Sequence, residues 1–135
     1  MTDSTHKVLV ANRGEIAVRI VQACVKLGLD FVCVHTPEDA ESGHVRLARE
    51  AGGEKEKRLY RVSSYHDANE LMAVADEAGA DAVHPGYGFF AEDYRFARRV
   101  SRRDNKLIFI GPSWRGIREL GDQNNTKRLA RSLGV

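Results

Sequence analysis

The chain has 135 residues, of which 42% are hydrophobic and 30% are charged, and its formal net charge is +2. This length suits a single domain over residues 1–135 with one hydrophobic core. So small a net charge favours neither nucleic acid nor an anionic membrane as a partner. No apolar run approaches the roughly 18 residues that a membrane span needs, and we expect no signal peptide at the start.

The two cysteines, Cys24 and Cys33, lie in apolar segments and have no CxxC spacing. We therefore interpret them as reduced thiols in the core and expect a cytoplasmic protein.

The first half of the chain alternates strand and helix patterns. Residues 7–11 and 31–35 are short, apolar and β-branched, which predicts two buried strands. A helix is expected between them, and Gly28 should end it. Residues 36–43 suit a loop, and residues 44–51 a short helix. The apolar stripe of the first helix is predicted to comprise Ile16, Ile20, Ala23, Cys24 and Leu27.

The second half continues the alternation. Asp67 and Glu70 have the spacing of a capping box in front of a helix that should end at Gly79. Asp122 suits the N-cap of the last helix. The other elements expected, in chain order, are strands at 58–62, 81–84 and 107–111, and helices from about 92 to 103, over 113–120 and over 122–133.

This alternation predicts a Rossmann-like three-layer α/β/α fold, with a five-stranded parallel sheet in the order 3-2-1-4-5. Ligands of such sheets bind beyond the carboxyl ends of the strands, where the strand order reverses. Here the reversal lies between strands 1 and 4, which are followed by 12-NRGEIA-17 and 84-HPGYGF-89. We therefore expect these two loops to share one crevice.

The candidate residues of this crevice each have a structural and a functional interpretation. Gly14 suits either a tight turn or backbone contact with a ligand. The two glycines that flank Tyr87 suit either positive φ angles or the close approach of another group. His84 suits a packed strand end more than a base. The full candidate set is Asn12, Arg13, Gly14 and Glu15 in the first loop, and His84, Gly86, Tyr87, Gly88 and Glu92 around the second.

Several other sites are not supported by the sequence. The first loop lacks the G-x-G-x-x-G pattern of dinucleotide sites, and no P-loop pattern occurs. The five histidines lack metal-ligand spacing with the cysteines, so we expect no metal site. The basic stretch 94–104 places its arginines mostly opposite Phe96, Ala97 and Val100, which favours a solvated helix face over a nucleic-acid site.

Four segments of the chain resemble the N-terminal domain of biotin carboxylase, which opens acetyl-CoA, pyruvate, propionyl-CoA and related carboxylases. The likeness covers residues 7 to 135. It is carried by 7-KVLVANRGEIAVRI-20, 84-HPGYGFFAED-93, 107-LIFIGPS-113 and 121-GD-122.

The resemblance implies a domain that precedes an ATP-grasp domain. The complete enzyme uses ATP, magnesium and bicarbonate to carboxylate biotin on a biotin carboxyl carrier protein. The family's acid–base and metal-binding residues belong to the ATP-grasp and C-terminal domains, which this chain lacks. We therefore expect this chain alone to be inactive and to bind no cofactor tightly.

The resemblance also assigns site residues. It places His84, Gly86, Tyr87, Gly88 and Glu92 along the biotin crevice. It places Gln123 and Lys127 near ATP, and it implies a possible homodimer through Arg19, Gln22 and Lys26.

The chain departs from the family pattern in three places. Phe90, Ala91 and Asp93 replace Leu, Ser and Asn of the family's second loop, and residues 52–62 are longer and more charged than usual. Gln123 replaces a lysine that reaches the ATP phosphates, and an uncharged amide cannot supply that cation. Lys127, one turn further on, is a partial substitute.

Two functions remain open on these residues. The first is the N-terminal domain of a biotin-dependent carboxylase, an ATP-dependent ligase. The second is a non-catalytic binding or interaction module that derives from this domain and has lost nucleotide contact, as Gln123 and the altered second loop would suggest. A self-sufficient nucleotide-binding protein is disfavoured because no phosphate loop is present.

Overall fold

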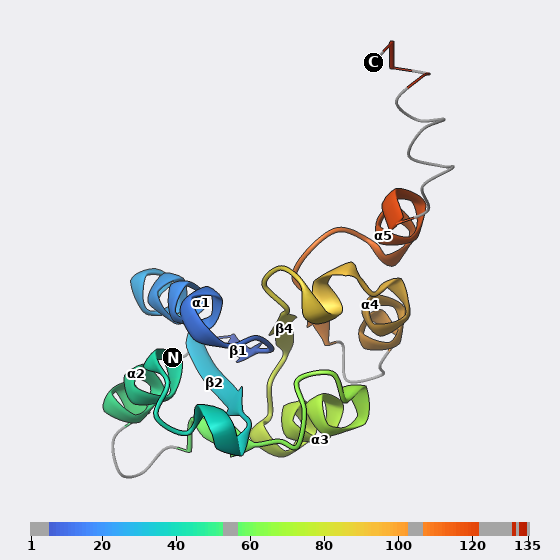
Figure 1. Ribbon diagram of the computed structural model, residues 1–135. Coiled ribbons are helices and arrows are strands. Elements are labelled where there is room, and N and C mark those ends of the chain that lie inside the picture. Colours follow the sequence, from blue (N-terminus) through green and yellow to red (C-terminus); the bar gives the residue numbers. More distant parts are fainter. Residues whose placement is uncertain (1–5, 53–56, 103–106, 122–130, 132, 135) are drawn as a thin grey trace.

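The computed structural model describes residues 6–52, 57–102, 107–121, 131 and 133–134. Its strands form a five-stranded sheet in which every pairing is parallel and the order is β3-β2-β1-β4-β5 (Figure 1). The predicted strand order is therefore confirmed. The strands are β1 (Lys7–Val10), β2 (Asp30–His35), β3 (Leu59–Arg61), β4 (Ala82–His84) and β5 (Ile108–Phe109).

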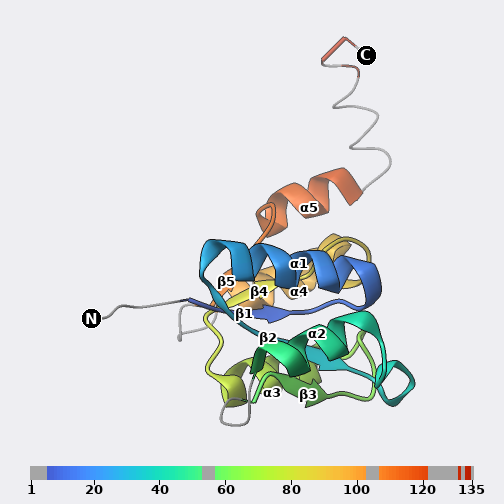
Figure 2. The ribbon, with the colours of Figure 1, turned by 90° about the vertical axis from the view of Figure 1, so that its left-hand side faces the viewer.

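Helices cover both faces of this sheet, as the alternation of elements predicts. Figure 1 shows α1 and α2 on one side and α3 and α4 on the other, and Figure 2 shows α5 at the periphery of the body. The helices are α1 (Gly14–Leu27), α2 (Gly43–Gly52), α3 (Ala68–Ala78), α4 (Tyr94–Ser101) and α5 (Trp114–Gly121), with short 3-10 helices η1 (Pro37–Asp39) and η2 (Phe89–Glu92).

The side chains of β1 alternate between two hydrophobic cores. Val8 and Val10 belong to the core under α1 and α2, whereas Leu9 belongs to the core under α3 and α4. All three are almost fully buried. Each such side chain contributes about 1.5 to 3 kcal/mol when it leaves water. Burial on both faces explains why the strand sequence is continuously apolar.

Helix α1 buries a different stripe from the predicted one. Ile20 and Cys24 are buried as expected, but Ala17 and Val21 complete the stripe. Ala23 is exposed and Leu27 is 71% exposed. The buried set follows the helical spacing of three and four residues, and it is rotated toward Val21 relative to the prediction. Gly28 ends the helix in the left-handed conformation, as predicted.

The capping prediction for α3 is half confirmed. Asp67 Oδ1 accepts a hydrogen bond of 3.1 Å from the backbone N–H of Glu70. The Glu70 carboxylate does not return this bond, because it accepts hydrogen bonds from the backbone N–H and the hydroxyl of Ser63 instead. Gly79 ends α3 in the left-handed conformation.

Helix α4 begins later than predicted. Glu92 belongs to η2, and α4 starts at Tyr94 because Asp93 caps it. Asp93 Oδ1 accepts from the backbone N–H of Arg95 at 2.9 Å and of Phe96 at 3.3 Å. A carboxylate at this position satisfies N–H groups that would otherwise lack a partner.

Most other elements differ from their predicted bounds by one or two residues, and two differ more. Strand β5 covers only Ile108–Phe109, although Ile110 still donates a backbone hydrogen bond to Val83. The loop predicted over 36–43 contains η1, with Pro37 at its first position. Most of the predicted last helix, with its cap Asp122, lies outside the described residues.

Candidate functional site

The loops after β1 and β4 lie against each other, as the sequence predicts. Asn12 is fully buried, and its side-chain N–H groups donate to the carbonyl oxygens of Pro85 at 2.7 Å and Tyr87 at 3.0 Å. Its side-chain oxygen accepts from the backbone N–H of Arg13. A backbone hydrogen bond from Ala11 to His84 closes the base of the junction. Asn12 is therefore the residue that joins the two loops.

Gly86 allows this close contact. A Cβ atom at this position would lie 2.6 Å from Ile16 Cγ2 and 2.8 Å from Asn12 Nδ2. Its φ of +68° is also a conformation that side chains disfavour. The group that approaches Gly86 closely is thus the protein's own first loop.

Gly88, in contrast, has an open face. Its φ of +73° and ψ of −168° fall in a region that essentially only glycine adopts. A Cβ atom there would meet nothing within 4 Å. The neighbouring Tyr87 is 72% exposed. The turn therefore presents bare backbone beside a projecting aromatic ring.

His84 supports the turn from the end of β4. Its Nδ1 accepts a 3.1 Å hydrogen bond from the backbone N–H of Gly86. Burial lowers its pKa, which favours the neutral ring with the proton on Nε2. This arrangement agrees with the interpretation of His84 as a packed strand-end residue.

Phe89 holds the far end of the turn. Its φ is +44°, which is unusual for a residue with a side chain. Its ring packs on Tyr65 at a centroid distance of 5.7 Å and on His66 at 4.8 Å. Next to it, Phe90 is buried and stacks on Phe96 at 4.3 Å. The two ring contacts of Phe89 hold it in this strained conformation.

A hollow of about 430 Å³ lies beside the turn. Glu92 is exposed at its edge, and because it lies in η2 it is not a first-turn acid of α4. The lining residues are Phe89, Glu92, Asp93, Tyr94 and Arg95.

The loop after β1 is held by an ion pair that sequence reasoning missed. Arg13 donates from Nε and from a terminal nitrogen to the two carboxylate oxygens of Asp39, each at 2.6 Å. The Tyr65 hydroxyl donates to the same carboxylate at 2.6 Å and accepts from the backbone N–H of Thr36 at 3.3 Å. The sequence did offer one signal for this ion pair. Asp39 follows the second strand, so a parallel sheet places it at the same edge as Arg13.

This pair has clear electrostatic consequences. Hydrogen bonding from Arg13 lowers the pKa of Asp39 to about 2, against the opposing effect of burial. Burial, with the hydrogen bond to Asp39, raises the pKa of Tyr65 to about 12. The Asp39 carboxylate raises the pKa of Arg13 in turn. At neutral pH the pair is therefore fully charged.

His44 is the second missed residue. It is fully buried, and its Nε2–H donates to the backbone oxygen of Val34 at 3.0 Å. Its Nδ1 accepts from the Ser42 hydroxyl at 2.9 Å and from the backbone N–H of Gly14 at 3.3 Å. Burial lowers the pKa of His44, so the neutral ring is favoured. The backbone N–H of Gly14 therefore already has a partner within the protein. This favours a tight turn over ligand contact as the role of Gly14.

The described sequence candidates on α1 face away from the turn. Glu15 pairs with Arg19 at 3.4 Å along the exposed side of α1. Gln22 and Lys26 are exposed on the same helix. Gln123 and Lys127 fall outside the described residues.

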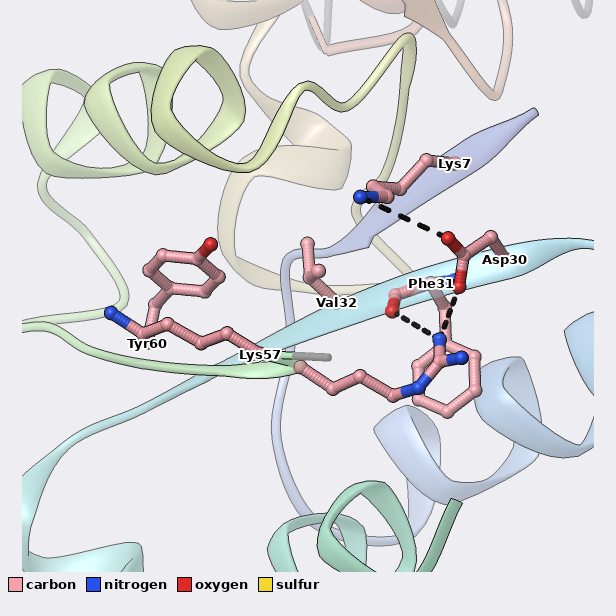
Figure 3. A pocket seen from close by; sticks show the side chains of 7 residues that line it. Lys7, Asp30, Phe31, Val32, Lys57 and Tyr60 are labelled. Atoms are coloured by element: carbon pink, nitrogen blue, oxygen red, sulfur yellow. Dashed lines mark hydrogen bonds and ion pairs between the residues drawn. The ribbon is translucent and has the colours of Figure 1, made fainter. Parts of the chain in front are cut away.

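A separate pocket of about 270 Å³ lies at the opposite, amino-terminal end of the sheet (Figure 3). Its charged groups are used internally: Lys7 Nζ donates to the backbone oxygen of Ala78 at 3.0 Å and lies 3.8 Å from Asp30, which also binds Arg58. Figure 3 shows Lys57 beside Tyr60, and the Lys57 ammonium lies 4.1 Å from the ring centroid. Ligands of open parallel sheets bind at the other end, so we place the candidate site at the turn.

Two kinds of feature are not found among the described residues. No three His, Cys, Asp or Glu side chains of this part of the chain are grouped to hold a metal ion. Within the same residues, no helix has the length and apolar character to cross a membrane.

The order of the sheet and the paired loops at its reversal point define a Rossmann-like domain. The model of the family described as "Biotin carboxylase, N-terminal domain" matches residues 4–117. The chain belongs to this family.

Similar proteins agree with this assignment. The biotin-dependent acyl-coenzyme A carboxylase alpha3 subunit of Mycobacterium leprae is 47% identical over 127 residues, which are 92% of this chain and 20% of that protein. The biotin carboxylase domain of a single-chain bacterial carboxylase has a TM-score of 0.85 and 40% identity, covering 97% of this chain and 30% of that one. The biotin carboxylase domain of a thermophilic 2-oxoglutarate carboxylase, bound to ADP, has a TM-score of 0.82 and 37% identity, covering 98% of this chain and 28% of that one. This chain thus spans less than a third of each.

Proposed function

We propose that this chain is the N-terminal domain of a biotin-dependent carboxylase. In the complete enzyme, ATP-grasp and C-terminal domains, supplied in cis or in trans, join it to carboxylate biotin with ATP, magnesium and bicarbonate. The chain accounts for one domain and is inactive by itself. A biotin carboxyl carrier protein and a cytoplasmic location belong to the same proposal.

The observation that carries this proposal is the open backbone of Gly88 beside the exposed ring of Tyr87. A flat ureido ring can approach bare backbone closely, and an aromatic side chain can cover one of its faces. Glu92 lies at the hollow next to this surface. We assign Tyr87, Gly88 and Glu92 to biotin contact.

The other candidates position this surface. Asn12, His84 and Gly86 set the turn through the contacts described above, and Arg13 and Gly14 are held by Asp39 and His44. Glu15 follows Gly14 in the first turn of α1, where it is exposed and pairs with Arg19, and we assign it no contact at the turn. Gln123 and Lys127 are assigned to the vicinity of ATP on the family resemblance alone.

The non-catalytic module is the less favoured alternative. The uncharged Gln123 supports it, but the relatives are biotin carboxylase subunits or domains. The altered second loop also supports this alternative less than the sequence suggested, because Asp93 keeps a polar role as the N-cap of α4.

The test combines this chain with the ATP-grasp and C-terminal part of the Mycobacterium leprae relative and measures biotin-dependent ATP hydrolysis. Hydrolysis should appear only in the mixture. Tyr87→Ala should lower it about tenfold, because ring contact with biotin is lost, whereas Arg46→Ala on α2 should not. Gln123→Lys should lower the KM for ATP by restoring a cation. No hydrolysis with either the wild type or Gln123→Lys would favour the module.

The same proposal includes a homodimer through Arg19, Gln22 and Lys26. These side chains are exposed on α1, beside the apolar surface of Val25 and Leu27. Sedimentation of the reconstituted mixture should show a dimer that Arg19→Glu weakens. A monomer at all concentrations would contradict this part without affecting the catalytic proposal.

A further inference from the structure

Helices α4 and α5 are joined by two reciprocal contacts between arginines and aromatic rings. Arg98 of α4 lies over the Trp114 ring of α5 at 5.0 Å, and Arg118 of α5 lies over the Tyr94 ring of α4 at 5.8 Å. Each ring has a second guanidinium over it. Arg115 lies 4.8 Å from the Trp114 ring, and Arg95 lies 5.7 Å from the Tyr94 ring. We call this cluster of four arginines and two rings the arginine face.

The arginine face is not neutralised by the described part of the chain. None of its four arginines forms an ion pair with a described carboxylate. The Nε–H of Arg98 is buried and has no hydrogen-bond acceptor. Two acids belong to these helices and the cap of α4: Asp93 is engaged as the N-cap of α4, and Glu119 of α5 is exposed and forms no ion pair with the four arginines. Arg95, Arg115 and Arg118 are exposed. Within the described residues, four guanidiniums therefore gather in one place with no carboxylate in ion-pair contact.

The rings hold these arginines in place. A guanidinium over an aromatic ring loses less side-chain freedom on binding, and its N–H fork remains able to bind a carboxylate in two-point fashion. Helix α5 lies at the periphery of the body, as Figures 1 and 2 show, and Arg95, Arg115 and Arg118 are exposed within the described residues. A prearranged set of bidentate donors is thus available to a partner.

We propose that the arginine face is a docking surface for an acidic protein surface that presents several carboxylates. Charge complementarity and the fork geometry favour carboxylates. The rings argue against single-stranded nucleic acid, because base stacking needs free aromatic faces, and both rings here already carry guanidiniums. The proposal is independent of biotin chemistry and of the crevice at the β4 turn.

The test uses a dye-labelled peptide of about eight glutamates and follows its fluorescence anisotropy with the purified chain at low salt. Arg95, Arg115 and Arg118 are replaced together by Gln. The matched control replaces three exposed arginines elsewhere, Arg46, Arg49 and Arg61, so that the change in net charge is the same. Arg98 is kept because it joins the two helices.

The control variant should bind the peptide within about twofold of the wild type, and the face variant about tenfold more weakly, because bidentate charge-assisted contacts are lost. Binding should weaken as salt rises. Circular dichroism should show that both variants are folded. Equal binding by the two variants would overturn the proposal. Tighter binding of an oligothymidine of equal charge, lost in the face variant, would overturn it in favour of nucleic acid.

Discussion

The buried side chain of Asn12 donates a 3.0 Å hydrogen bond to the carbonyl oxygen of Tyr87, which lies 75 residues further along the chain. This bond and its partner to Pro85 connect the loop after β1 with the turn after β4. The exposed Tyr87 and the open Gly88 are therefore placed by a residue that is itself inaccessible. The surface formed by Tyr87 and Gly88 depends on an amide in the protein interior.

Replacement of Asn12 by Ala should disturb both stability and the turn. The carbonyl oxygens of Pro85 and Tyr87 would lose their donor, which costs about 2 to 3 kcal/mol for buried polar groups. Urea unfolding should show this loss, and the reconstituted enzyme should lose biotin-dependent hydrolysis. Asn69→Ala, at an exposed position of α3, is the control and should unfold as the wild type does. An unchanged midpoint for Asn12→Ala would contradict the structure of the junction.

Gly86 and Gly79 have similar backbone angles but different surroundings. Their φ angles are +68° and +70°, yet a Cβ atom at Gly86 would overlap Ile16 and Asn12, whereas one at Gly79 meets nothing within 4 Å. Gly79→Ala should therefore cost only about 1 kcal/mol of backbone strain. Gly86→Ala should cost about 3 kcal/mol or more, because overpacking adds to the same strain. If the two variants had similar thermal midpoints, the loops around Gly86 would be less tightly packed than the structure shows.

Acid should weaken the ion pair of Asp39 with Arg13. The pKa of Asp39 is lowered from 3.8 to about 2 in the folded chain. Stability from a lowered carboxyl pKa is fully present above the unfolded value and is lost as pH falls through the folded one. This contribution, roughly 2 kcal/mol, should disappear between about pH 4 and pH 2.

Asp39→Asn should therefore be less stable than the wild type at pH 7 and should lose less stability on acidification. Urea unfolding over that pH range would measure both effects. Glu41→Gln, which is exposed in the same loop, is the matched control and should keep the wild-type acid limb. Parallel pH profiles for Asp39→Asn and the wild type would disprove the role of the pair.

The two cysteines should be unreactive in the folded chain. Burial raises the pKa of Cys33 to about 12 and also raises that of Cys24, and both side chains are buried free thiols. Because the thiolate is the reactive form, a thiol reagent at pH 8 should label them only after unfolding. Labelling in urea gives the control for complete reaction. Fast labelling of the native chain at either cysteine would contradict the packing of α1 against β2.

Much of the fold could be predicted from local patterns. The β-branched run at 7–10, the helix-ending Gly28 and Gly79, and the cap at Asp67 all act within a few neighbouring residues. A boundary was predicted too early where two signals compete. Asp93 and Glu92 both suit a helix start, and the side-chain bonds of Asp93 decided for the later one.

The candidate site could be located but not explained from the sequence. The reversal of strand order placed the two glycine-marked loops together, which the bonds of Asn12 confirm. The sequence left open what approaches each glycine, and the structure shows protein at Gly86 and open space at Gly88. Asp39 and His44 were missed because nothing in their immediate neighbourhood marks them as partners of Arg13 and Gly14.

The sequence by itself determined the order of strands and helices, the edge of the sheet where the loops after β1 and β4 meet, and the family. These depend on periodicity, glycine positions and short motifs, which involve residues that are close together in the sequence. Only the tertiary structure decided which polar side chains meet, because Arg13 and Asp39 are 26 residues apart and Asn12 and Tyr87 are 75 apart. Such contacts form only when the sheet brings distant segments to one edge, and burial then makes each unpaired polar group costly.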